Sequence, residues 1–232
     1  MPVLDFSALL GGAYRDWLLA GLRLSLLLTA GCVLLALPLA GAISLARLAP
    51  HRGLRGLAWL FVEGVRSVPL LVHMLFWYFA APELLPQHLR DWLYAGQIET
   101  AAAVVALTLY TAAYMSEDIR SGLRAVPRTQ LEAARALGLS FVAAMRLVIL
   151  PQALRITVPP LISQTLNLWK NTSIATVIGT AELMYQAQRV ETATFRGFET
   201  FALATAAYLS LSLAISAVAW GFQRRYPARP AP

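Results

Sequence analysis

The stretch LRLSLLLTAGCVLLALPLAGAISLA, residues 22–46, is a continuous apolar run whose only charged residue is Arg23. A bilayer core about 30 Å thick needs roughly 20 apolar residues in a single helix. A transmembrane β-barrel would instead show segments of ~10 residues in which apolar and polar side chains alternate. This stretch does not alternate, so the sequence predicts an all-α membrane protein.

Further apolar runs repeat this pattern along the chain. With only 13% charged residues, the composition is far from that of soluble proteins. We therefore expect a bundle of about five transmembrane helices, surrounded by membrane lipid and forming a single domain over residues 1–232. The runs fall at residues 24–46, 57–81, 98–116, 156–179 and 200–222.

The formal net charge of +7 would suit nucleic-acid binding, but the positions of the charges argue against that function. With the N-terminus outside, twelve basic residues lie in inner segments, four in outer segments and three at or within spans. The positive-inside rule therefore predicts an external N-terminus and a cytoplasmic C-terminus. The inner residues are Arg47, Arg52, Arg55, Arg120, Arg124, Arg128, Arg135, Arg146, Arg155, Arg224, Arg225 and Arg229, the outer ones are Arg15, Arg90, Arg189 and Arg196, and the rest are Arg23, Arg66 and Lys170.

A polar segment, EAARALGLSFVAAMRLVILP at residues 132–151, separates the third and fourth runs. Pro127 can occupy the first turn of a helix, which strong helix formers then continue. Gly138 can supply the left-handed residue that ends this helix, and Ser140 can cap a second one. We expect the second helix to stop at Pro151. The segment is thus either a pair of short helices in water or an ordinary solvated loop with helical content.

These residues resemble the cytoplasmic EAA signature of ABC-importer permeases, which here reads Glu132-Ala133-Ala134, then Gly138, then VILP ending in Leu150 and Pro151. Nearly the whole chain resembles the permeases of polar amino acid importers, and TFRGFETF at residues 194–201 looks most like their glutamate/aspartate branch. The stretches that carry this resemblance are residues 63–82, 113–140, 149–184 and 194–209.

The resemblance implies a type I importer in the bacterial inner membrane, with two permease subunits, two cytoplasmic ATPase subunits and an extracytoplasmic amino acid binding protein. The second permease subunit could be identical to this one or different. The family's EAA loop docks on the ATPase, so the resemblance implies a coupling loop within residues 116–155. Its coupling residues would be Glu132, Ala133, Ala134, Gly138, Leu150 and Pro151.

Other functions fit the sequence less well. A P-loop needs a lysine followed by serine or threonine, and the only lysine, Lys170, precedes Asn171. We expect a transport subunit without an ATPase site, a cofactor or a metal, since Cys32 is alone and neither H-E-x-x-H nor G-x-S-x-G is present. A secondary transporter would need two matching halves around a midplane site, and five spans do not divide evenly.

Lys170 is the central candidate for a translocation pathway. A lysine at the centre of a span costs about 2.5–3.5 kcal/mol on insertion scales, so it should either line a water-filled path or gate, or hydrogen-bond a neighbouring helix. Asn171 and Thr172 follow it in KNTS, where the family commonly has KDTS, so a neighbouring anion is gone. Arg66 begins RSVP, where the family commonly has RGTP, and completes the candidate set.

Two further side chains of the second run suit structural roles. Glu63 and Arg66 are three residues apart on one helix face and can pair. His73 has no acid one turn away, so packing or a satisfied hydrogen bond fits better than a proton relay.

An unpaired cation in a wet path attracts anions. The sequence thus favours glutamate or aspartate as the imported amino acid, with glutamine or another polar or basic amino acid as the alternative.

Overall fold

The computed structural model describes residues 5–227, and over this range every regular element is a helix. Four helical stretches are long and apolar enough to cross a membrane, and the number is five when one bent pair is counted as a single span. The expected all-α membrane bundle of about five spans is therefore confirmed. In chain order the elements are α1 (Gly12–Leu48), α2 (Arg52–Arg66), α3 (Leu70–Leu75), η1 (Phe76–Ala80), η2 (Ala81–Leu84), α4 (Gln87–Ala95), α5 (Ile98–Ala125), α6 (Arg128–Ala136), α7 (Phe141–Ala144), η3 (Met145–Ile149), α8 (Leu150–Asn171), η4 (Thr172–Ile178), α9 (Leu183–Thr194) and α10 (Gly197–Arg225).

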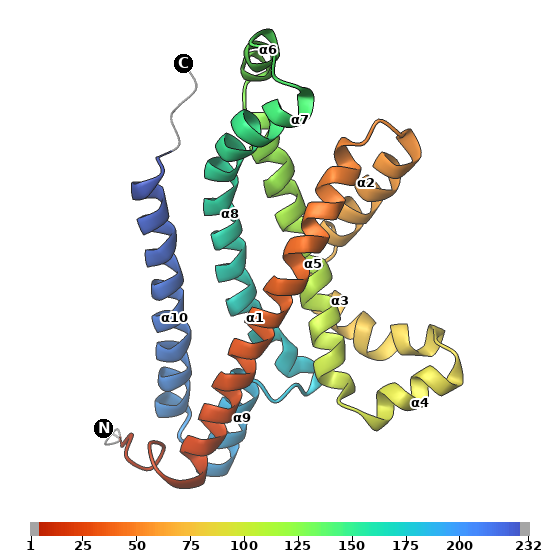
Figure 1. The fold of residues 1–232 in the computed structure, drawn as a ribbon. Helices are drawn as coiled ribbons and strands as arrows, with labels where there is room; N and C mark the ends of the chain where they lie inside the picture. Colours follow the sequence, from red (N-terminus) through yellow and green to blue (C-terminus); the bar gives the residue numbers. More distant parts are fainter. Residues whose placement is uncertain (1–4, 228–232) are drawn as a thin grey trace.

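Helix α5 forms the centre of the bundle and packs against α1, α2 and α8 (Figure 1). Its buried face carries the small residues Ala102, Ala103 and Ala106, which allow helices to approach closely in a membrane. At Gly122 a Cβ atom would overlap the side chain of Thr157, so glycine is required where α5 meets α8. Small residues on the central helix therefore set the tight packing of the core.

The second crossing is not the continuous helix that its apolar run at residues 57–81 predicts. It breaks between α2 and α3, which are bent by 104°. Pro69 has no N–H to donate to the carbonyl of Val65, and it disfavours helical geometry at Val68. The ring Nε2 of His73 lies 3.0 Å from that Val65 oxygen. His73 thus makes the satisfied hydrogen bond expected for it and holds the break.

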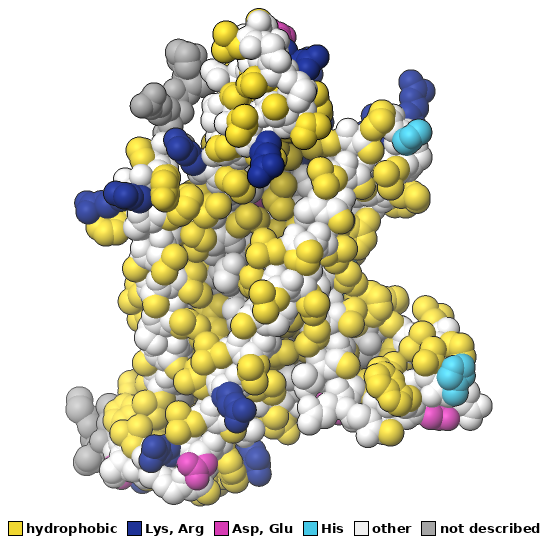
Figure 2. All heavy atoms as spheres, in the orientation of Figure 1, with side chains coloured by type: hydrophobic (Ala, Val, Ile, Leu, Met, Phe, Trp, Pro, Cys, Tyr) yellow, Lys and Arg dark blue, Asp and Glu magenta, His cyan; other side chains and the backbone are white. Residues whose placement is uncertain are grey.

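Two shorter helices, α4 and α9, were not anticipated from the apolar runs, because neither is long enough to span a bilayer. In Figure 1 both lie toward the lower end of the bundle, whereas α6, α7 and the end of α10 lie toward the upper end. Figure 2 shows a largely hydrophobic middle with charged side chains gathered toward the two ends. This arrangement suits a chain that crosses a membrane an odd number of times.

Candidate functional site

The polar segment between the third and fourth spans forms two short helices, α6 and α7, at the tip of the bundle (Figure 1). Gly138 adopts a left-handed φ of 85°, as predicted. The amides of Gly138 and Leu139 donate to the carbonyls of Arg135 and Ala134, which closes α6 with a Schellman motif. The Ser140 hydroxyl accepts from the Ala143 amide at 3.2 Å and caps α7. The helix pair predicted for this segment is therefore confirmed.

The tip of this insert exposes apolar side chains. Leu137 is 84% and Val142 is 72% exposed. On α6, Glu132 and Ala133 are exposed while Ala134 is buried. Exposed apolar side chains that cluster on a water-facing element mark an interaction surface. Glu132 and Ala133 therefore lie on a surface that no element of residues 5–227 covers, whereas Ala134 faces inward.

The prediction that the second helix stops at Pro151 is wrong. Pro151 lies in the first turn of α8, which follows α7 and η3 without interruption. The wide π-helical turn of η3 accommodates the proline, whose missing N–H leaves a standard helical bond unmade. The side-chain amide of Gln152 donates to the carbonyl of Val148 at 2.9 Å and supports this turn. Helix α7, η3 and α8 consequently form one continuous helical stretch, whereas α6 is separated from them by the turn at Gly138.

The base of the insert rests on an apolar groove of about 760 Å³. Leu45 and Leu48 of α1 line one part of it, and Leu131 of α6 and Leu150 of α8 line others. Val126, Ile149 and Ala153 form a small buried cluster beside it. Leu150 therefore contacts the root of the insert rather than its exposed tip.

A second hollow, of about 420 Å³, lies between α5 and α8 and is lined by two of the four pathway candidates. Lys170 and Asn171 line it, and Lys170 is exposed. Arg66 lies beside the hollow, with its guanidinium carbon 5.0 Å from the ring centre of Tyr114. Thr172 does not reach the hollow, since it is buried and donates to the Trp169 carbonyl at 2.8 Å.

The pairing expected between Glu63 and Arg66 is not formed. Among the ion pairs of residues 5–227, neither residue takes part. The Arg66 guanidinium instead lies over the ring of Tyr114 on α5, and an aromatic face attracts cations.

Several lining residues of this hollow were missed by sequence reasoning. Tyr110 and Tyr114 are one turn apart on α5, and their hydroxyls are hydrogen-bonded at 3.3 Å. Gln164 and Asn167 continue the α8 wall toward Asn171. Polar residues at positions i, i+3 and i+7 of an apolar span lie on one helix face, and this spacing would have identified the α8 wall.

Glu182 is a buried carboxylate that joins three helices near the other end of the bundle. It accepts from Ser25 of α1 at 3.2 Å and from Tyr208 of α10 at 2.9 Å. The amides of Met184 and Tyr185 donate to it at 3.0 and 2.9 Å, so it also caps α9. This network fixes α9 between α1 and α10 and explains how a carboxylate is tolerated in the interior.

The fold and its projecting helix pair define a class, that of multi-pass helical membrane proteins with a pair of short helices between two spans. Residues 23–228 match the family described as binding-protein-dependent transport system inner membrane component. The chain belongs to this family, which places it in the inner membrane. The resemblance to ABC-importer permeases drawn from the EAA segment is thereby confirmed.

Individual relatives are similar over most of the chain. The glutamate/aspartate import permease protein GltJ of Escherichia coli strain K12 is 34% identical, over 88% of this chain and 85% of its own. The probable glutamine ABC transporter permease protein GlnM of Bacillus subtilis is 37% identical, over 91% and 90%. The arginine transport system permease protein ArtQ of Bacillus subtilis is 31% identical, over 96% and 97%.

One solved structure also resembles this chain closely. It is a crystal structure of an amino acid ABC transporter with histidines, with a TM-score of 0.84 and 31% identity over 96% of this chain and 99% of that one. These relatives are transport components rather than catalytic enzymes, and they argue against an ATPase-independent secondary transporter.

Proposed function

We propose that this chain is the permease subunit of an ATP-driven importer of amino acids, and that acidic amino acids, glutamate or aspartate, are its substrates. The observation that carries the substrate proposal is the hollow between α5 and α8. Its lining within residues 5–227 includes one cation, Lys170, and no carboxylate, and the Asp118 carboxylate outside the lining accepts from Gln164 at 3.0 Å. An anionic side chain passing this wall meets an attractive charge, and the permease GltJ, which imports glutamate and aspartate by its name, is among the relatives.

Coupling is proposed to run through residues 116–155, with an ATPase dimer docked on the tip of α6 and α7. Glu132 and Ala133 would face the ATPase, while Gly138 would set the angle of the turn. Because α7 continues into α8, a movement of α7 would reach the α8 wall of the hollow. The complex would also contain a second permease subunit and an extracytoplasmic binding protein, with the N-terminus of this chain outside and its C-terminus in the cytoplasm.

The substrate proposal is tested with the complete transporter reconstituted in liposomes with its binding protein. Uptake of glutamate, aspartate, glutamine and arginine is compared for wild type, Lys170→Met and Asn171→Asp. We expect glutamate or aspartate uptake to fall roughly tenfold in Lys170→Met, which corresponds to about 1.4 kcal/mol, and to fall less in Asn171→Asp. Both substitutions make the electrostatic potential at the hollow less positive, so both should lower the uptake of anionic amino acids.

Arg189→Met is the matched control, because it removes one exposed cation from α9, where Arg189 lies over Trp17 and outside the hollow. Full uptake of acidic amino acids by both test variants, with normal assembly, would assign Lys170 a dispensable structural role. Preferential uptake of glutamine or arginine by wild type would support the alternative substrate class while leaving the permease function intact.

A further inference from the structure

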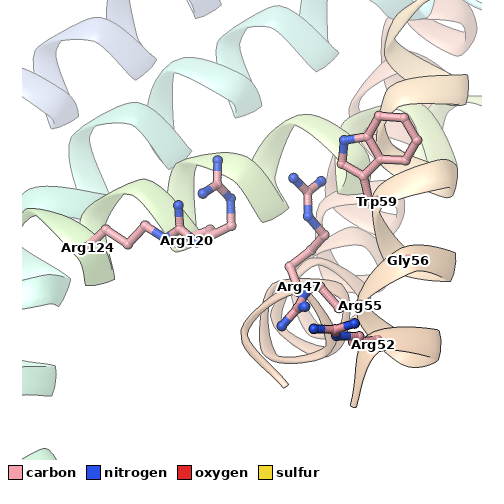
Figure 3. A pocket seen from close by; sticks show the side chains of 7 residues that line it. All are labelled: Arg47, Arg52, Arg55, Gly56, Trp59, Arg120 and Arg124. Atoms are coloured by element: carbon pink, nitrogen blue, oxygen red, sulfur yellow. The ribbon is translucent and has the colours of Figure 1, made fainter. Parts of the chain in front are cut away.

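A third hollow, of about 300 Å³, lies where α1, α2 and α5 meet at the end of the bundle that carries α6. It shares Arg124 with the groove at the base of the insert and has no lining residue in common with the polar hollow between α5 and α8. Figure 3 shows that its basic side chains come from all three helices. Its lining includes Arg47 of α1, Arg52, Arg55 and Trp59 of α2, and Arg120 and Arg124 of α5.

These five arginines outnumber the acceptors available to them. Glu117 pairs with Arg47 at 3.1 Å and with Arg120, so one carboxylate serves two guanidinium groups. Within residues 5–227, Arg52, Arg55 and Arg124 form no ion pair. The Nη1 atom of Arg47 is sealed from water and has no hydrogen bond of good geometry. The hollow therefore has an excess of positive charge and of hydrogen-bond donors.

The surroundings of the hollow are apolar on the side of α2. Leu57 and Leu60 of this helix are 68% and 61% exposed, and Leu45 of α1 is 67% exposed. Trp59 lies between Leu57 and Leu60 in the sequence and has half of its surface exposed. A tryptophan beside exposed leucines and arginines at the end of a span is typical of the depth of lipid headgroups.

We propose that this hollow binds the phosphate of an anionic phospholipid, with the acyl chains lying along the exposed leucines of α2. Guanidinium groups bind phosphate oxygens in a bidentate fork, and basic pockets between transmembrane helices bind anionic headgroups. A soluble anion would contact the arginines but not the exposed leucines beside them, whereas a phospholipid contacts both. With the proposed orientation of the chain, on which this point rests, the bound phospholipid belongs to the cytoplasmic leaflet.

The test measures lipid retained by the complete transporter after purification in detergent. Native mass spectrometry follows titration with phosphatidylglycerol, with phosphatidylethanolamine and with inorganic phosphate. For the double variant Arg52→Gln/Arg55→Gln we expect phosphatidylglycerol affinity to fall roughly 10- to 30-fold, since one basic residue near an anionic headgroup strengthens binding about fivefold. The double variant Arg52→Lys/Arg55→Lys keeps both positive charges but removes the bidentate guanidinium geometry. Its phosphatidylglycerol affinity should therefore fall less.

The matched control is Arg224→Gln/Arg225→Gln, which removes two exposed charges from the end of α10 beside Trp220 without touching the hollow. Equal loss of phosphatidylglycerol in test and control variants would show diffuse attraction and overturn the site. Competition by inorganic phosphate at the lipid's own concentration would overturn the lipid assignment in favour of a free anion. If the Arg52→Gln/Arg55→Gln variant no longer co-purifies with the ATPase while its lipid binding is unchanged, the lipid site is overturned and this face contacts a protein instead. Because none of these measurements uses transport, they are independent of the proposed substrate.

Discussion

Gly138 shows how one residue can control the shape of a docking element. It is the only glycine between α6 and α7, and its φ of 85° lies where side chains with a Cβ are strained. No atom outside its immediate neighbours lies within 4 Å of the position a Cβ would take. Substitution would therefore act through backbone strain alone and not through a steric clash.

We predict that Gly138→Val abolishes or strongly reduces transport while the chain remains inserted in the membrane. A left-handed conformation costs a residue with a side chain roughly 1–2 kcal/mol, and a β-branched side chain makes the cost larger, so the α6–α7 turn would rearrange. Uptake by the reconstituted transporter and co-purification of the ATPase measure the effect.

Ala136→Val supplies the control, because it places the same side chain at an exposed position within α6. Uptake by Gly138→Asn should lie between the uptake of Gly138→Val and that of Ala136→Val, since asparagine tolerates the left-handed conformation better than valine. Normal uptake by Gly138→Val would mean that coupling does not need this turn.

At the scale of the element, the break between α2 and α3 depends on a proline and a histidine that act on one carbonyl group. Pro69 removes the amide that would bond Val65 in a continuous helix, and the Val68 amide reaches that carbonyl only at 3.4 Å. His73 returns from the next turn and supplies the shorter contact at 3.0 Å. Its ring also packs against Tyr110, with ring centres 6.0 Å apart. The break is thus linked to the wall of the polar hollow.

We predict that His73→Leu lowers the thermal stability of the purified transporter, because it removes a hydrogen bond worth about 0.5–1.5 kcal/mol. His73→Gln keeps a donor and should be milder. The double variant Pro69→Ala/His73→Leu should lose less stability than the two single variants added together, since an alanine at position 69 restores an N–H near Val65. Strict additivity in this double-mutant cycle would contradict the proposed role of His73.

At the scale of the whole molecule, the segments between the helices lie at opposite ends of the bundle, and this limits how the chain can be oriented in the membrane. The chain segments 125–150 and the end of α10 lie toward one end of the bundle, and residues 83–98 lie toward the other (Figure 1). We predict that reporter fusions place residues 125–150 in the cytoplasm and residues 83–98 outside, in agreement with the excess of inner basic residues. The reverse assignment would overturn the orientation, and a result that puts both segments on one side would contradict the fold itself.

The lengths of the apolar runs were sufficient to predict the all-α membrane class, and a few turn residues were sufficient to predict the helix pair. These features depend on local rules, namely the length of an apolar run and the backbone preferences of Gly138 and Ser140. The break at Pro69 could also have been read locally, but the apolar run continued through it and masked the turn.

Other features were decided by how the helices pack. The sequence could not show that Arg66 lies over Tyr114 and not beside Glu63, because that contact depends on how α2 packs against α5. It could not show that Glu182 meets Ser25 and Tyr208, or that five arginines from three helices share a hollow. Each of these contacts joins residues far apart in the chain, and their distances follow from the packing of the spans. Apolar runs and turn residues were therefore enough to predict that this protein crosses the membrane and which segment forms the short helix pair, whereas packing alone decided which polar side chains meet between the helices.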